Sequence, residues 1–155
     1  MNNLSQISTI LFAVFSISSQ AQISFGGLPS TSQTRALRNA EAIPSITVTP
    51  DTTEEIEANQ FAYQVNEKID ITKEASASVE GNSIIYRLLI HSENAKSINL
   101  IFDPITLPDK ANTFLYRPDG GEIYGAYPNA SFAGNVFATT PVSVDSIMIQ
   151  CEVPI

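Results

Sequence analysis

Few side chains in this sequence are of the types that perform catalysis. His91 is the only histidine and Cys151 the only cysteine among 155 residues. A hydrolytic site needs a nucleophile beside a base, and the sequence contains neither a Gly-x-Ser-x-Gly turn nor a Gly-Asp-Ser-Gly-Gly run. One histidine and one cysteine also fall short of the ligand set of a structural zinc site. We therefore expect no catalytic residue, no cofactor and no metal, with a structural or surface His91 and a buried, inert Cys151.

Acidic residues offer a weaker candidate site. Four aspartates stand at the ends of predicted strands, where loops can gather oxygen ligands for calcium: Asp103, Asp109, Asp119 and Asp145. Aspartate is also a favoured turn residue, and no EF-hand spacing is present. The sequence favours turns over a calcium site.

Aromatic residues offer another candidate. Tyr124, Tyr127 and Phe132 would form a platform for a carbohydrate if their rings were exposed. Anchoring in the core or in a loop is the favoured interpretation, and a glycan stays an alternative partner.

Composition limits the classes of partner. Hydrophobic residues make up 43% of the chain and charged residues 15%, which is enough apolar material for a folded core. Sixteen acidic and eight basic residues give a formal charge of −8. Nucleic acids and anionic membranes attract Lys/Arg surfaces, so neither is an expected partner.

The N-terminal residues have the pattern of a signal peptide, although no Lys or Arg precedes the apolar run Ile7–Ile17. Ser19 and Ala21 supply the small residues required before a cleavage site, which predicts a signal peptide over 1–21 and cleavage before Gln22. The run is shorter than the roughly 20 residues of a membrane span. We expect a secreted protein, extracellular or periplasmic in a bacterium.

An extended leader is predicted over 22–59, before a domain over 60–155. The leader is rich in Ser, Thr, Pro and Glu and lacks a sustained period. Within it, Ser45–Pro50 could pair as an edge strand and Thr53–Glu57 could form a helical turn.

The domain is organised around Ser83–Ser92. Side chains alternate across a strand, so Ile84, Tyr86, Leu88 and Ile90 share an apolar face and Ile85, Arg87, Leu89 and His91 a mixed one. This alternation predicts a strand with one face against a core and the other partly covered.

Other short alternating segments predict the remaining strands. They are separated by Pro, Gly and Asp-Gly turn signals and comprise Ile69–Ile71, as part of a strand pair before the turn-like Glu80–Asn82, Ile98–Phe102, Phe114–Tyr116, Glu122–Ala126, Asn135–Thr139 and Ile147–Glu152. No helical period is sustained. The sequence thus predicts an all-β domain, an antiparallel β-sandwich or jelly roll.

Several segments in order along the chain resemble a known family. They are Ser24–Pro29, Ala95–Asp103, Leu107-Pro108, Phe114–Tyr116, Asp119-Gly120, Ile123–Tyr127 and Phe137–Val142. Together they resemble the N-terminal, non-catalytic propeptide region of secreted trypsin-like lysyl endopeptidases from Bacteroidetes-type bacteria, over about Gln22 to Val153. Two departures are Val144-Asp145, where the family usually has Gly-Asp, and Gln150–Glu152, where it has an acidic-aromatic run.

The resemblance implies a pro-domain that assists the folding of a downstream serine protease domain or keeps it inactive. No catalytic residue carries over, because the family's triad lies in that protease domain. The chain would be a fragment of a longer secreted peptidase, and Arg35 and Arg38 of the leader are candidates to enter its active-site cleft. The alternative is a secreted module that binds carbohydrate or another cell-surface polymer.

Overall fold

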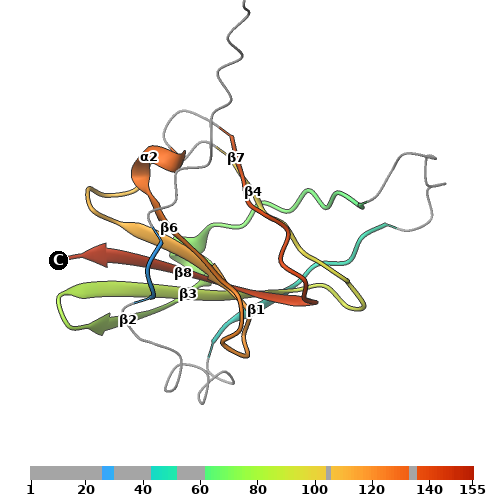
Figure 1. The fold of residues 1–155 in the computed structure, drawn as a ribbon, viewed down its shortest axis with the longest axis horizontal. Helices are drawn as coiled ribbons and strands as arrows, with labels where there is room; N and C mark the ends of the chain where they lie inside the picture. Colours follow the sequence, from blue (N-terminus) through green and yellow to red (C-terminus); the bar gives the residue numbers. More distant parts are fainter. Residues whose placement is uncertain (1–25, 30–42, 52–61, 104–105, 133–135) are drawn as a thin grey trace, which may run out of the picture.

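A computed structural model describes residues 26–29, 43–51, 62–103, 106–132 and 136–155 of the chain. It consists mainly of β-strands, which confirms the predicted all-β class (Figure 1). The large sheet contains β1 (Ser45–Thr47), β2 (Ser76–Glu80), β3 (Ser83–His91), β5 (Asn112–Tyr116), β6 (Ile123–Pro128) and β8 (Ser146–Pro154). A separate two-stranded ribbon contains β4 (Ile101–Phe102) and β7 (Phe137–Ala138), and two single-turn helices are α1 (Ile71–Glu74) and α2 (Asn129–Phe132).

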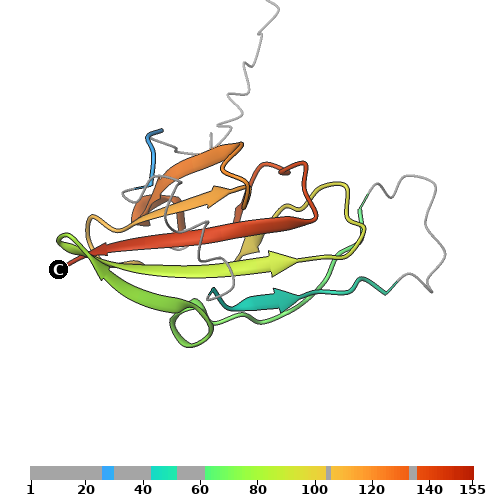
Figure 2. The same cartoon turned by 90° about the horizontal axis from the view of Figure 1, so that it is seen from below.

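The two longest strands form the centre of the large sheet. β3 and β8 pair antiparallel over their full length, from Ser83↔Pro154 to His91↔Ser146. β5 follows on the far side of β8, and β6 lies beyond β5. Figure 2 shows this order, with β6 at one side of the sheet and β1 and β2 at the other. The predicted central strand Ser83–Ser92 is confirmed as β3.

β1 and β2 share the other edge of β3. β2 runs antiparallel to its first half, and β1 runs parallel to Leu89–His91. The edge strand predicted within Ser45–Pro50 is therefore confirmed. The parallel direction was not predicted, because the alternation within a strand does not specify its partner.

The segment before β2 departs from prediction. Ile69–Ile71 alternates as a strand would, but the structure has no strand there, and α1 begins at Ile71. Asp70 is its N-cap, and the Asp70 carboxylate accepts hydrogen bonds from Thr72 N at 3.1 Å and Thr72 Oγ1 at 2.6 Å. A carboxylate that satisfies an N-terminal amide stabilises a helical turn locally, and here it prevails over the alternation.

The core lies between one face of the sheet and the β4–β7 ribbon. Leu88, Ile90, Ile147 and Ile149 project from the sheet into it. Phe132 of α2 is fully buried and packs edge-on against Phe102 and Phe137 of the ribbon, with ring centroids 5.3 and 5.0 Å apart. Such pairs add to the stabilisation that burial provides.

The opposite face of the sheet is also buried at its centre. Phe114, Tyr116 and Met148 form a second apolar cluster, against which Ile43, Leu89 and Ile123 pack. Gln150 and Arg87 lie beside it and are 0% and 7% exposed. The predicted mixed face of β3 is confirmed, and Arg87 on it is more buried than the alternation indicates.

Three predictions fall on residues outside the described ranges. They concern the signal peptide, the helical turn Thr53–Glu57, and Arg35 and Arg38. Across the residues that the structure does describe, no helix has the length and apolar content needed to cross a membrane.

Candidate functional site

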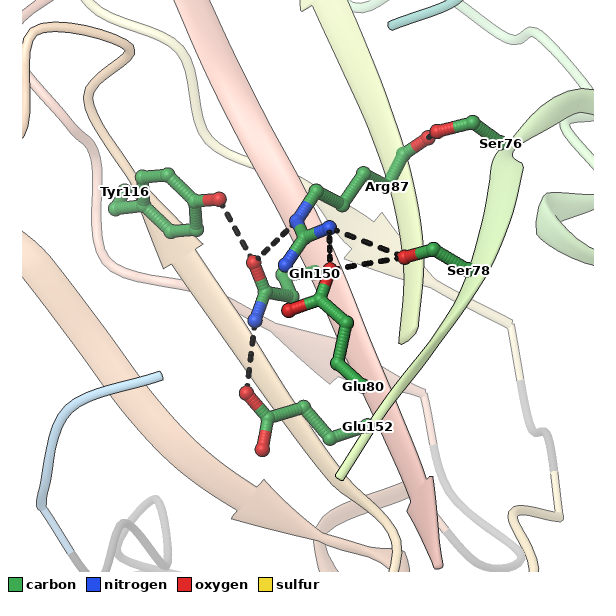
Figure 3. Close-up of polar contacts among 7 residues, drawn as sticks. All are labelled: Ser76, Ser78, Glu80, Arg87, Tyr116, Gln150 and Glu152. Carbon is green, nitrogen blue, oxygen red and sulfur yellow. Dashed lines mark hydrogen bonds and ion pairs between the residues drawn. The ribbon is translucent and has the colours of Figure 1, made fainter. Parts of the chain in front are cut away.

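A group of polar side chains crosses the second face of the sheet from β2 to β5 (Figure 3). We call it the polar cluster; its members are Ser76, Ser78 and Glu80 of β2, Arg87 of β3, Tyr116 of β5, and Gln150 and Glu152 of β8. The strand register aligns the first three strands, because Ser76 pairs with Arg87 and Arg87 pairs with Gln150. On β5, the residue that pairs with Gln150 is Phe114. Tyr116 therefore reaches Gln150 diagonally across the sheet.

Gln150 is the centre of the polar cluster. Its Oε1 accepts two hydrogen bonds at 2.9 Å, from Arg87 Nε and from the Tyr116 hydroxyl. Its Nε2 donates to Glu152 Oε1 at 2.8 Å. A buried amide must be satisfied in this way, since an unsatisfied one costs about 1–3 kcal/mol.

Arg87 connects the centre of the sheet to its edge. Its Nη1 lies 2.7 Å from Glu80 Oε1 and donates a longer hydrogen bond of 3.4 Å to Ser78 Oγ. Ser78 Oγ also donates to Glu80 Oε1 at 2.9 Å, and Ser76 Oγ donates to the Arg87 main-chain oxygen at 3.3 Å. The three β2 side chains that point to this face are thus held by one residue of β3, Arg87.

The electrostatics of the polar cluster keep Arg87 charged and Tyr116 neutral. Burial acts to lower the pKa of Arg87, but the hydrogen bond and the charge of Glu80 outweigh it and raise that pKa. Burial raises the pKa of Tyr116, and the nearby Arg87 charge offsets only part of this effect. The phenol therefore remains a hydrogen-bond donor at neutral pH.

This arrangement has the chemistry of a structural clamp. Its donors and acceptors point at one another, and it contains no thiol or imidazole. A serine hydroxyl that donates to a carboxylate already salt-bridged to arginine has no free base to activate it. The polar cluster fixes the edge strand β2 against β3.

His91 lies at the far end of β3 and has a partner that the sequence did not predict. Its Nδ1 is 2.8 Å from Ser146 Oγ, and that hydroxyl donates to Asp145 Oδ1 at 3.0 Å. Serine stands between histidine and aspartate, whereas in a hydrolytic triad the histidine stands in the middle. The nearby main-chain amide of Ser92 donates a hydrogen bond to the Asp145 main-chain oxygen at 2.8 Å. The prediction of a structural histidine fits this geometry, and its partner Ser146 was not indicated by the alternation within the strand.

The other sequence candidates are dispersed or buried. Cys151 is 5% exposed on the core face, as its alternation predicts, and burial raises the pKa of its thiol. Asp119 forms a salt bridge with Arg117 at 2.6 Å. Within the described ranges, no three His, Cys, Asp or Glu side chains gather as metal ligands, so the aspartates considered for calcium do not come together.

The proposed aromatic platform is wrong. Tyr127 and Phe132 are 3% and 0% exposed and belong to the core, while Tyr124 is half-buried against it. The favoured interpretation, anchoring in the core, is confirmed.

One shallow cleft lies beside the C-terminal end of β3. It has a volume of about 300 Å³ and is lined by Val48, Thr49, Pro50, Glu93 and Asn94. The chain there is held to β3 by a hydrogen bond from Val48 N to His91 O at 2.8 Å. A single carboxylate and a single amide give this cleft no acid–base pair.

Comparison with known proteins gives no family to which the chain can be assigned: no family model, no curated protein and no solved structure matches it.

Proposed function

We propose that the chain is a secreted, non-catalytic domain that acts on a partner protein, in the manner of the pro-domain that precedes a trypsin-like lysyl endopeptidase. The large sheet and the β4–β7 ribbon would be the two layers of a sandwich-like domain. The partner would be a serine protease domain whose folding the chain assists or whose activity it restrains.

The attachment of the leader to both sides of the sheet supports this proposal. Gly26 O accepts a hydrogen bond from Ala126 N of β6 at 3.1 Å, and β1 pairs with β3 at the other side. The leader segments on either side of 30–42 are therefore anchored to one sheet. Arg35 and Arg38 lie within 30–42, outside the described residues. A segment anchored at both ends would have a smaller entropic cost of binding in a protease cleft than a free peptide.

The experiment uses a trypsin-like, lysine-specific endopeptidase and a chromogenic lysyl substrate. We expect the full chain to slow hydrolysis, or to raise the yield of active enzyme when the denatured protease refolds in its presence. A synthetic peptide spanning 22–59 should inhibit more weakly than the full chain, because it lacks the sheet that anchors it.

The variant R35A/R38A tests the leader, with R117A as its control. Arg117 is a partly exposed arginine directly after β5, and its side chain forms an ion pair with Asp119. We expect R35A/R38A to weaken inhibition at least tenfold and R117A to leave it unchanged. A wild-type chain with no effect on either hydrolysis or refolding would refute the pro-domain role.

A further inference from the structure

The outer edge of β2 is an open sheet edge within the part of the chain that the structure describes. Among the described strands, β2 pairs with β3 and with no other. Open edges are commonly protected by charged side chains, proline or a bulge. The charged residue of β2 (Ser-Ala-Ser-Val-Glu) is Glu80, which is paired with Arg87 on the second face, and the register of β2 with β3 is unbroken. By contrast, β6 at the other side of the sheet carries an irregular register with β5 and a hydrogen bond to Gly26.

The hydrogen bonds of β3 identify which groups of β2 face outward. Leu89 N donates to Pro44 O, and His91 O accepts from Val48 N, so the odd-numbered residues of β3 direct their main chain toward this edge. In an antiparallel ladder the bonding residues alternate. Ser76, Ser78 and Glu80, which stand opposite odd-numbered residues, therefore bond to β3. Ala77 and Val79 direct their amides and carbonyls away from the sheet.

The side chains around these groups are accessible and apolar. Ala77 is exposed, and Val79 is 69% exposed. Val79 stands opposite Ile84, and Ile84 opposite Val153, which makes one apolar row across three strands. Ile155 lies two residues after Val153 and is 70% exposed. Its main-chain amide donates a hydrogen bond to Asn82 O at 3.0 Å. The row offers contact for alternate side chains of an added strand.

The polar cluster holds this edge in place before any partner binds. Arg87 contacts Ser76, Ser78 and Glu80, which are the side chains that β2 directs to the second face. A rigid edge loses little conformational entropy on binding, so its main-chain groups retain more of their binding free energy.

We propose that the outer edge of β2 binds an extended, basic segment of a partner protein, which adds a strand to the sheet through the main chain of Ala77 and Val79. Such strand addition draws affinity from main-chain hydrogen bonds and specificity from alternate side chains. The formal charge of −8 favours a segment with Lys or Arg at its ends. The same charge on two copies of the chain disfavours a dimer through this edge.

This inference rests on the proposed function, because it locates where the partner protein docks. The probe is the peptide acetyl-Lys-Val-Thr-Val-Lys-amide, titrated into the isotope-labelled full chain. We expect the amide signals of Ala77 and Val79 to shift and their hydrogen exchange to slow at least tenfold. A peptide with proline in place of the second valine, which lacks one of the main-chain donors directed at β2, should bind at least tenfold more weakly.

Two lysine substitutions provide a matched pair. Val79→Lys places a charge on the β2 edge, whereas Val136→Lys places the same charge on a valine that is 62% exposed next to β7. We expect V79K to weaken peptide binding at least tenfold and V136K to leave it within twofold of the wild type. Equal binding by V79K and the wild type would overturn the proposal.

The free chain gives an independent test. Protection of the Ala77 and Val79 amides that does not depend on concentration would show that the chain covers its own edge. Protection that increases with concentration, together with a dimer in analytical ultracentrifugation, would show a second copy there. Either result would overturn the proposal.

The protease assay separates this inference from the proposed function. Peptide binding by a chain that affects neither protease activity nor refolding would refute the pro-domain role and keep β2 as a docking edge. Protease inhibition that V79K leaves unchanged would keep the pro-domain role and overturn docking at β2.

Discussion

Replacing Arg87 by methionine tests whether the polar cluster stabilises the sheet through its ion pair. Arg87 and Glu80 side chains are 8% and 26% exposed and lie 2.7 Å apart. Removing one partner of a buried pair costs about 3–5 kcal/mol, because the other charge stays buried without compensation. Since water reaches part of Glu80, we expect the lower end, about 3 kcal/mol. This is a large share of the 5–15 kcal/mol typical of a domain.

A double-mutant cycle isolates the pair. Glu80→Gln should cost about 1 kcal/mol, because Arg87 retains Gln150 Oε1 as an acceptor at 2.9 Å. The variant R87M/E80Q removes both charges and should cost about 2 kcal/mol, less than the sum of the single changes. The coupling would then be about 2 kcal/mol.

Urea unfolding, monitored by far-ultraviolet circular dichroism, measures these free energies. Constant slopes of the unfolding free energy against urea would show that the variants unfold over the same surface. If R87M does not fold, Arg87→Lys provides the measurement. Lysine keeps the charge but loses the planar fork that donates both to Glu80 and, through Nε, to Gln150 Oε1, which should cost about 1–2 kcal/mol. Additive costs in the cycle, or an R87M variant as stable as the wild type, would refute the role of the pair.

Three further predictions follow from local geometry. Burial raises the pKa of Tyr116 above 10.0, so the stability that its neutral phenol provides below pH 10 should be lost as the pH rises through the raised value. Tyr116→Phe should flatten this loss in urea midpoints measured at increasing pH, and an unchanged slope would contradict the assignment. Hydrogen bonds from Lys73 and Thr72 lower the pKa of Asp70 to about 2. The Asp70 cap should therefore stabilise α1 above pH 3.8 and weaken as the pH falls to about 2. Lys73→Met should raise the pKa of Asp70 in a carboxyl NMR titration. A titration unaffected by Lys73→Met would exclude that ion pair. Gly125→Ala should lower the free energy of unfolding in urea by about 2 kcal/mol more than Gly27→Ala does. Both glycines have positive φ, but only at Gly125 would the new Cβ lie 2.7 Å from a main-chain oxygen of β5. Equal costs would show that β5 moves aside.

The strands with regular alternation could be predicted from the sequence, and those held by tertiary contacts could not. β3 and β8 were predicted because their apolar residues alternate over long segments. The strand pair expected before Glu80–Asn82 was located at Ile69–Ile71 and not at β2, because Ser-Ala-Ser-Val-Glu has weak β-propensity and its place depends on the turn at Gly81 and on Arg87.

The polar cluster could not be predicted from the sequence, because its side chains also meet only through tertiary contacts. Alternation placed Arg87 on a mixed face, but its partner Gln150 is 63 residues away in the sequence. His91 and Ser146 are 55 residues apart and meet only through the β3–β8 register. A charged residue in the middle of an apolar strand was the available signal, because such a residue is rarely buried without a partner.

The polar cluster and the open edge of β2 are linked by register. Side chains of a strand change face when its pairing shifts by one residue. A one-residue slip of β2 would move Glu80 away from Arg87 and onto the face that carries Ile84, while Val79 would come to face Arg87. The slip would also exchange the amides that bond to β3 for those that face outward. The contacts of Arg87 with Ser76, Ser78 and Glu80 oppose that slip. They therefore determine that the main-chain groups of Ala77 and Val79 face outward, where a partner strand could bind.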